Sequence, residues 1–224
     1  MTLISPDQSV RIDPIVDNNG HYSRFAMRIY SWLIDPLLRS LRPRVVNVCR
    51  RRNLRSVLDI ASGTGAQCIL LDHAGIQATG IDLSKAMIDC ASRRSPPTIR
   101  YVHGSAFELP FDDDAFEGVL LLLALHEHSE RERLAMLSEA QRVLMHNGCL
   151  VLAEYSVPKN VATNISWWVI RIIEWLAGGD HRRNFHEFAS SGGIKGLESR
   201  TLLKVLERQS SHRGTIEIVV ASFS

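Results

Sequence analysis

The most informative segment of this 224-residue chain is a glycine-rich turn. The apolar run Val57–Ile60 leads into Ala61-Ser62-Gly63-Thr64-Gly65, and a helical pattern follows. Glycines at positions 63 and 65 let a ligand approach the backbone closely, and the N-terminus of the next helix offers unpaired N–H groups. Asp59, just before the turn, would put a carboxylate beside a cationic group of the ligand. The segment therefore predicts a ligand site where a strand turns into a helix.

The spacing argues against two common ligands. The dinucleotide fingerprint needs a third glycine or small residue, and Cys68 stands at that position. No Gly-Lys-Ser/Thr follows, so the turn is not a Walker phosphate loop. Asp82 ends the next apolar strand, where a carboxylate can accept hydrogen bonds from both ribose hydroxyls. A helix N-cap or a surface carboxylate is the alternative for Asp82.

A histidine follows the fourth apolar run of the chain. His126 would lie at the carboxyl edge of a parallel sheet, where ligands bind in doubly wound folds. Its imidazole could act as a general base near neutral pH, and a solvated loop histidine is the alternative. The sequence His126-Glu127-His128 lacks the helical spacing of a zinc peptidase, so no metal site is predicted.

Strands and helices alternate in the central part of the chain, which indicates a doubly wound sheet. The fold predicted is α/β: a Rossmann-like, mostly parallel, seven-stranded sheet with an antiparallel C-terminal strand. The expected strands are 56–60, 77–82, 99–103, 118–125, 149–155, 201–206 and 215–222, and the expected helices are 67–73, 84–92, 130–143, 160–178 and 184–194.

The chain divides at about residue 54. Residues 1–54 are expected to form a polar leader and a helical lid, interrupted at Pro36 and broken or restarted at Pro43. Residues 55–224 would form the Rossmann-like domain, with a substrate-facing helical insertion at about 157–196.

Composition indicates an ordinary soluble protein. Hydrophobic residues make up 45% of the chain, enough for a sizeable core, and the net charge is only +2. The four cysteines are widely spaced, so we expect buried, reduced thiols rather than a disulfide framework. The N-terminal residues do not resemble a signal peptide, and no apolar run is long enough to span a bilayer. A cytoplasmic protein is expected.

Four segments in the expected order resemble the motifs of a known family. They are VLDIASGTGAQ, GIDLSKAMIDCA, GSAFELPFDDDAFEGVLLLLALHE and AQRVLMHNGCLVLAEY, and they cover residues 55–156, about half the chain. Together they resemble class I S-adenosylmethionine-dependent methyltransferases, and among these the ubiquinone/menaquinone-biosynthesis C-methyltransferase-like group. The resemblance implies S-adenosylmethionine as cofactor and S-adenosylhomocysteine as product.

The resemblance also implies roles for residues of the first two motifs. Asp59, Gly63 and Gly65 would hold the methionine part of the cofactor, and Asp82 would bind the ribose. The family usually has glycine where Ala61 stands, so the turn would be slightly less open here.

The later motifs would surround the adenine and the sulfonium. Leu83 and Met87 would pack beside the adenine, and Ser105 and Ala106 would lie at its edge. The family usually has aspartate at the position of Ser105, so weaker cofactor binding is expected. The segment from Leu122 to His126 would form the floor beneath the sulfonium.

Residues of the lid and of the insertion are candidates for contact with the acceptor. In similar methyltransferases the N-terminal segment folds over the cofactor, which makes Tyr22 a candidate catalytic residue and Tyr30 a second aromatic of that lid. In the insertion, His181, Phe185 and His186 are candidates for acceptor contact. Core packing is the alternative for all of them.

The acceptor is expected to be small and lipophilic: quinone-like, phenolic or a lipid. The helix 164–176 is apolar around most of its circumference, so it could pack in the core or a homodimer, line an acceptor pocket, or rest on a membrane. The arginines between Arg42 and Arg55 have no interleaved aromatic residues, so a nucleic-acid partner is not expected. A scaffold that binds the cofactor without catalysis is the alternative function, and a nicotinamide-dependent oxidoreductase fails on the fingerprint.

Overall fold

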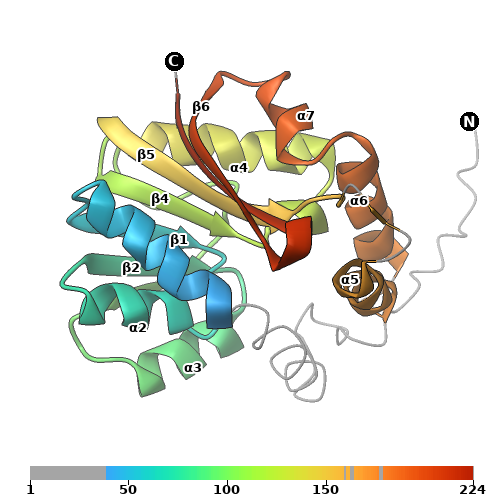
Figure 1. The fold of residues 1–224 in the computed structure, drawn as a ribbon. Coiled ribbons are helices and arrows are strands. Elements are labelled where there is room, and N and C mark those ends of the chain that lie inside the picture. Colours follow the sequence, from blue (N-terminus) through green and yellow to red (C-terminus); the bar gives the residue numbers. More distant parts are fainter. Residues whose placement is uncertain (1–38, 159, 162–163, 177–178, 224) are drawn as a thin grey trace, which may run out of the picture.

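A seven-stranded sheet forms the centre of the computed structural model, which describes residues 39–158, 160–161, 164–176 and 179–223 (Figure 1). The strand order is β3-β2-β1-β4-β5-β7-β6; β1 to β5 are parallel, and β7 runs antiparallel to β5 and β6. The predicted fold class is confirmed. The strands are β1 (Ser56–Ile60), β2 (Gln77–Asp82), β3 (Arg100–His103), β4 (Phe116–Leu122), β5 (Leu144–Tyr155), β6 (Leu203–Ser211) and β7 (Ile216–Phe223).

Helices connect the strands and cover both faces of the sheet. Beyond the ends of β4 and β5, the helices α5 and α6 pack beside the carboxyl edge of the sheet (Figure 1). The helices are α2 (Ala66–His73), α3 (Lys85–Arg94), α4 (Glu130–Val143), α5 (Ile165–Leu176), α6 (Gly179–Ser190) and α7 (Ile194–Glu198), with short 3-10 turns η1 (Leu125–Glu127) and η2 (His212–Gly214).

Several predicted boundaries are wrong. Strand β4 ends at residue 122 rather than 125, α5 begins at residue 165 rather than 160, and β6 ends at residue 211 rather than 206. Strand β5 begins at Leu144 rather than at Cys149, because Asn147-Gly148 lies inside the strand at an irregularity in its pairing with β4. A Cβ on Gly148 would come within 2.7 Å of the Glu117 carbonyl oxygen, so this glycine allows the two strands to approach. The helix predicted over 184–194 is α6, which begins at Gly179 and is followed by the separate helix α7.

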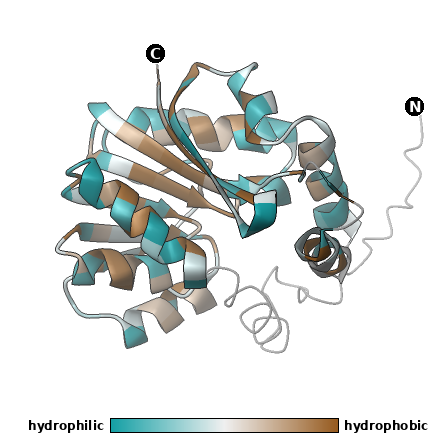
Figure 2. Cartoon of the chain, in the orientation of Figure 1, coloured by the Kyte–Doolittle hydropathy of each residue, from teal (hydrophilic) through white to brown (hydrophobic). Residues whose placement is uncertain are grey.

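Alternation along the central strands divides the core into two layers. On β4, Leu120 packs into one layer, while Val119 and Leu121 pack into the other. Such strands are buried on both faces, which explains the unbroken apolar run in the sequence. Figure 2 shows these hydrophobic strands between helices whose outer faces are hydrophilic.

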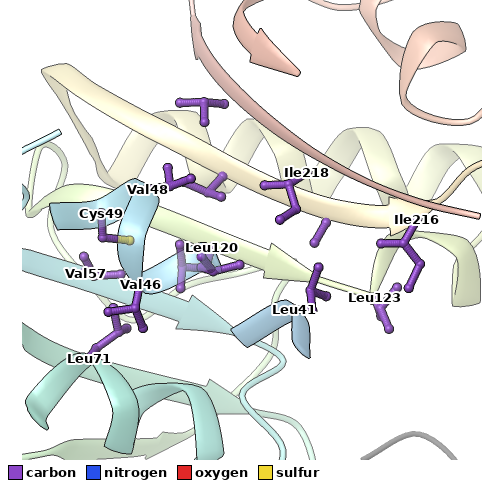
Figure 3. Packing of buried hydrophobic residues seen from close by; sticks show 14 of the residues in the cluster. Leu41, Val46, Val48, Cys49, Val57, Leu71, Leu120, Leu123, Ile216 and Ile218 are labelled. Atoms are coloured by element: carbon purple, nitrogen blue, oxygen red, sulfur yellow. The ribbon is translucent and has the colours of Figure 1, made fainter. Parts of the chain in front are cut away.

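The helix over residues 39–51 packs on the sheet. Its side chains Leu41, Val46 and Val48 are buried in the layer that contains Leu120 (Figure 3). Pro43 does not break this helix, contrary to the sequence prediction. Part of the predicted lid segment, residues 1–54, therefore belongs to the core of the sheet. Residues 1–38 of that segment lie outside the described residues.

A buried arginine on α4 fastens the carboxyl edge of the sheet to the insertion. The guanidinium of Arg133 donates to the backbone carbonyls of Leu125 (3.0 Å) and Asn184 (3.0 Å) and lies over the ring of Phe188. Asn184 returns a bond from its side-chain amide to the carbonyl of Glu127 (2.7 Å). These polar contacts set the position of α6 relative to η1.

We expect Arg133→Met to lower the free energy of unfolding by about 2–4 kcal/mol, because the carbonyls of Leu125 and Asn184 each lose a charged donor while the apolar stem is kept. The exposed Arg131 on the same helix provides the matched control, and Arg131→Met should stay within about 0.5 kcal/mol of the wild type. Denaturant titration measures both values, and equal effects would show that the buried contacts of Arg133 contribute little.

Candidate functional site

A cavity opens at the carboxyl ends of β1, β2 and β4, where ligands bind in doubly wound folds. The residues around it come from the turns that follow these strands and from the loop after β3. All but two of the predicted cofactor residues line it. Those that do are Ala61, Gly63, Asp82, Leu83, Met87, Ser105, Ala106 and Leu122.

Further lining residues were not predicted. Gly104 and Phe107 flank the predicted Ser105-Ala106 pair, and Glu127 and His128 bring ionisable groups to the cavity. The position of His128 two residues after His126 is the only sequence signal for it. The remaining lining residues that sequence reasoning missed are Ile81, Ser84 and Met136. Of the segment predicted to form the floor beneath the sulfonium, Leu123 and Ala124 line the cavity together with Leu122, whereas Leu125 and His126 do not.

The turn after β1 takes a backbone shape that favours glycine. Ala61, Gly63 and Gly65 all have positive φ angles, of 58°, 54° and 76°. A left-handed conformation at an alanine costs roughly 1 kcal/mol, so the turn must be held from outside. The glycine that the family usually has at position 61 would adopt this conformation without that cost.

Asp82 supplies much of that hold. One of its carboxylate oxygens accepts the Gly63 N–H at 2.8 Å, and the other accepts the Ser84 N–H at 2.8 Å. Burial raises the pKa of Asp82, and the two backbone donors oppose that rise. The carboxylate thus joins the turn after β1 to the turn after β2, and it also lines the cavity.

Asp59 and Gly65 are the two predicted cofactor residues that do not line the cavity. Asp59 is 3% exposed, and the Cys68 thiol donates to its carboxylate at 3.6 Å. Burial raises the pKa of Asp59 to about 7, although the Cys68 hydrogen bond acts in the opposite direction. Gly65 caps α2, and the Tyr101 hydroxyl donates to its carbonyl at 3.3 Å. Both residues make their contacts outside the cavity, Asp59 with the Cys68 thiol and Gly65 with the Tyr101 hydroxyl.

His126 is buried in an ionic network instead of lining the cavity. It is 2% exposed, so the alternative of a solvated loop histidine is wrong. Its Nδ1 lies 2.8 Å from the Glu154 carboxylate, and its Nε2 lies 3.7 Å from Glu174. His181 approaches the other oxygen of Glu174 at 2.6 Å. Burial alone would lower the pKa of His126, but the two carboxylates raise it to about 9.

Aromatic rings surround this network. The rings of Tyr155 and Phe185 lie 4.6 Å and 6.1 Å from His126, and Trp167 packs on Phe185 at 5.9 Å. His181 and Phe185, two of the candidates for acceptor contact, gather around His126, whereas His186, the third, is exposed. Tyr22 and Tyr30 lie outside the described residues.

Comparisons with known proteins show which family this chain resembles. Residues 57–148 match the family model described as a methyltransferase domain. The chain contains a methyltransferase domain. It resembles a demethylmenaquinone methyltransferase of Thermotoga maritima, with 30% identity over 66% of this chain and 65% of the relative. A demethylmenaquinone methyltransferase of Clavibacter sepedonicus is 35% identical over 46% of this chain and 42% of the relative.

The fold of this methyltransferase domain recurs in solved structures. An O-methyltransferase family protein from Burkholderia thailandensis superposes with a TM-score of 0.68, covering 89% of this chain and 60% of that one, at 16% identity. The predicted resemblance to methyltransferases of menaquinone biosynthesis is confirmed. The chain spans 42% and 65% of the lengths of the two curated relatives, so the activity of the whole protein is a separate question.

The two glycines of the methyltransferase turn should respond differently to an added methyl group. A Cβ on Gly65 would lie 2.2 Å from the Tyr101 hydroxyl oxygen, so Gly65→Ala should lower the free energy of unfolding by about 2–4 kcal/mol. A Cβ on Gly63 meets no heavy atom of the described residues within 4 Å, so Gly63→Ala should cost only about 1 kcal/mol of backbone strain. Denaturant unfolding compares the two, and an equal loss would contradict this geometry.

The buried Asp59 carboxyl group should make the ligand-free domain less stable as pH rises. Its pKa of about 7 in the folded state exceeds the ordinary value of 3.8, so the folded state binds the proton more tightly. The resulting stabilisation is complete below about pH 4 and is lost as the pH rises through 7.

The Asp59→Asn variant isolates this contribution. Its stability relative to wild type should increase by up to about 4 kcal/mol between pH 4 and pH 8. Chemical denaturation at a series of pH values measures the difference. A constant difference would show that Asp59 is ionised in the folded protein throughout this range.

Proposed function

We propose that this protein transfers a methyl group from S-adenosylmethionine to a small lipophilic acceptor of quinone-like chemistry. The observation that supports it best is the cavity at the sheet's carboxyl edge, which gathers residues from the first three of the four family-like motifs, in the turns and loops after β1, β2, β3 and β4. The names of the curated relatives support the acceptor class, because both are demethylmenaquinone methyltransferases.

The residues present fit the cofactor. The space beside Gly63 is open among the described residues, which suits close approach of a ligand to the backbone. Asp82 uses each carboxylate oxygen once on a backbone donor, and each keeps a lone pair that could accept a ribose hydroxyl. Leu83 and Met87 would pack beside the adenine. Ser105 accepts the Phe107 N–H at 3.1 Å and keeps a second lone pair for the adenine amino group.

The bound cofactor would supply an activated methyl group on a sulfonium, whose departure as a neutral thioether needs little acid–base assistance. The protein's main contribution would then be to hold the acceptor in line at near-attack distance and to exclude water. The general-base role predicted for His126 has no direct support, because that imidazole is buried behind the cavity wall. Glu127 and His128 are the ionisable side chains that reach the cavity from η1 and its end.

The outer face of α5 would suit a lipophilic environment. Trp168 is 46% exposed, and Ile165 and Ile172 are exposed on the same side of the helix. No helix of the described residues is long and apolar enough to cross a membrane. We include in the proposal that this face contacts a membrane surface or a second copy of the chain.

The first test is calorimetric binding of S-adenosylmethionine and S-adenosylhomocysteine. Both should bind to the wild type, and Asp82→Ala should weaken binding by about 100-fold or more, because two charge-assisted bonds to ribose are lost. Ser105→Ala should change affinity by less than about 10-fold. Asp89→Ala, which removes an aspartate paired with Lys85 on α3, is the control and should bind as the wild type does.

Turnover should then be followed with demethylated naphthoquinols as acceptors. The absence of binding at millimolar cofactor would reject the methyltransferase proposal. Binding without turnover over a broad panel of quinols, phenols and lipids would favour the non-catalytic scaffold instead.

A further inference from the structure

Three potential metal ligands converge beside the methyltransferase cavity. His126 on η1, Glu174 on α5 and His181 on α6 each offer one donor atom, and these atoms all lie within 4.8 Å of one another. His126 and Glu174 are buried and His181 is largely so. Two histidines and one carboxylate are a common ligand set for zinc and for other divalent transition metals.

The hydrogen bonds around these residues determine which atoms are available. Glu154 is fully buried on β5, and its carboxylate accepts the Leu125 N–H at 2.6 Å and lies 2.8 Å from Nδ1 of His126. Nδ1 must therefore carry a proton, which leaves Nε2 to face the Glu174 carboxylate. A histidine held through its other nitrogen by a buried carboxylate is the usual second shell of a metal site.

The buried carboxylates beside His126 require a compensating positive charge. Glu154 and Glu174 are both buried, and uncompensated carboxylates in such surroundings are very costly. Nε2 of His126 faces an oxygen of Glu174 at 3.7 Å, and either a proton on Nε2 or a bound cation supplies positive charge between them. Two additional protons, one on each histidine, would neutralise the pair, and so would one divalent cation.

The distances suit a cation after small side-chain shifts. Donor atoms about 2.0–2.1 Å from a tetrahedral zinc ion lie about 3.3 Å from one another. The separations here are 3.7 Å between His126 Nε2 and Glu174 Oε1, and 2.6 Å between His181 Nε2 and Glu174 Oε2. These two separations involve different oxygens of Glu174 and would each change by less than about 1 Å, and all three donor atoms already lie within 4.8 Å of one another.

We propose that His126, Glu174 and His181 bind one divalent transition-metal cation, with Glu154 orienting His126 from behind. The cation would join η1, α5 and α6 and so fix the insertion on the edge of the sheet. This site is separate from the cofactor cavity, and its existence does not depend on the methyltransferase proposal.

Zinc binding to the whole chain, free of any histidine tag and stripped with a chelator, tests this proposal. Calorimetry should show one equivalent of Zn²⁺ bound, and an excess of 100-fold over the dissociation constant should raise the midpoint of thermal unfolding by about 5–10 °C. Co²⁺ should give the visible absorption of a tetrahedral site with nitrogen and oxygen ligands.

Variants identify the ligands. Glu174→Gln and His181→Ala should each abolish the single site and the thermal shift, and Glu154→Gln should weaken binding by about 10- to 100-fold. His186→Ala removes an exposed histidine from the same helix as His181 and should leave binding unchanged. Folding of each variant is checked by circular dichroism before titration.

Two results would overturn the proposal. If folded wild-type protein binds no Zn²⁺ or Co²⁺, the network is held by protons alone. If the binding is as strong in His181→Ala as in the wild type, or is lost in His186→Ala, the metal binds elsewhere. A failure to bind S-adenosylmethionine would leave these outcomes unaffected, so the two proposals are tested independently.

Discussion

The carboxylate of Asp82 is the constraint on which the cavity depends. It accepts backbone N–H groups from two turns that follow neighbouring parallel strands, at Gly63 and at Ser84. The turn after β1 contains three residues with positive φ, one of them an alanine, and such a backbone needs external bonds to persist. Because the same carboxylate lines the cavity, the group best placed to bind a ribose also shapes the surface around it.

A second polar cluster holds the neighbouring part of the sheet edge. Glu154 accepts bonds from the Leu125 and Tyr155 backbones and contacts His126, while Arg133 joins Leu125 to α6. Buried charges of this kind stabilise a fold only when their partners are in place, so each one restricts the positions of the elements that bear the others. Apolar packing stabilises the sheet itself, and these polar contacts hold η1 and α6 at its carboxyl edge.

Local sequence patterns were sufficient to predict the fold class, and most of the residues predicted for the cavity do line it. Residues such as Gly63, Asp82 and Ser105 follow their strands directly, and the carboxyl ends of parallel strands must meet at one edge of the sheet. The burial of Asp59 was not predictable in this way, since it depends on packing against Cys68 beneath the turn. Cys68, which excluded the dinucleotide fingerprint, thus proves to be the hydrogen-bond donor to that carboxylate.

The network around His126 was beyond sequence reasoning for a different reason. Glu174 and His181 stand 48 and 55 positions after His126 and belong to helices whose buried faces only the tertiary fold decides. Neither the spacing in His126-Glu127-His128 nor the apolar character of α5 indicated that Glu174 points inward. A motif search examines neighbours in sequence, whereas this cluster is assembled from η1, β5, α5 and α6.

The family match covers the turns around the cofactor cavity but only a part of the network around His126. The match to the methyltransferase domain ends at residue 148, before Glu154, Glu174 and His181. The matched segment contains all the residues that line the cavity, and the helices α5, α6 and α7 lie beyond it. Since the acceptor must approach the methyl group from outside the cofactor cavity, the adjoining insertion is where acceptor choice would be decided. The aromatic rings around His126 and the buried charges beside them lie where this insertion meets the end of β5.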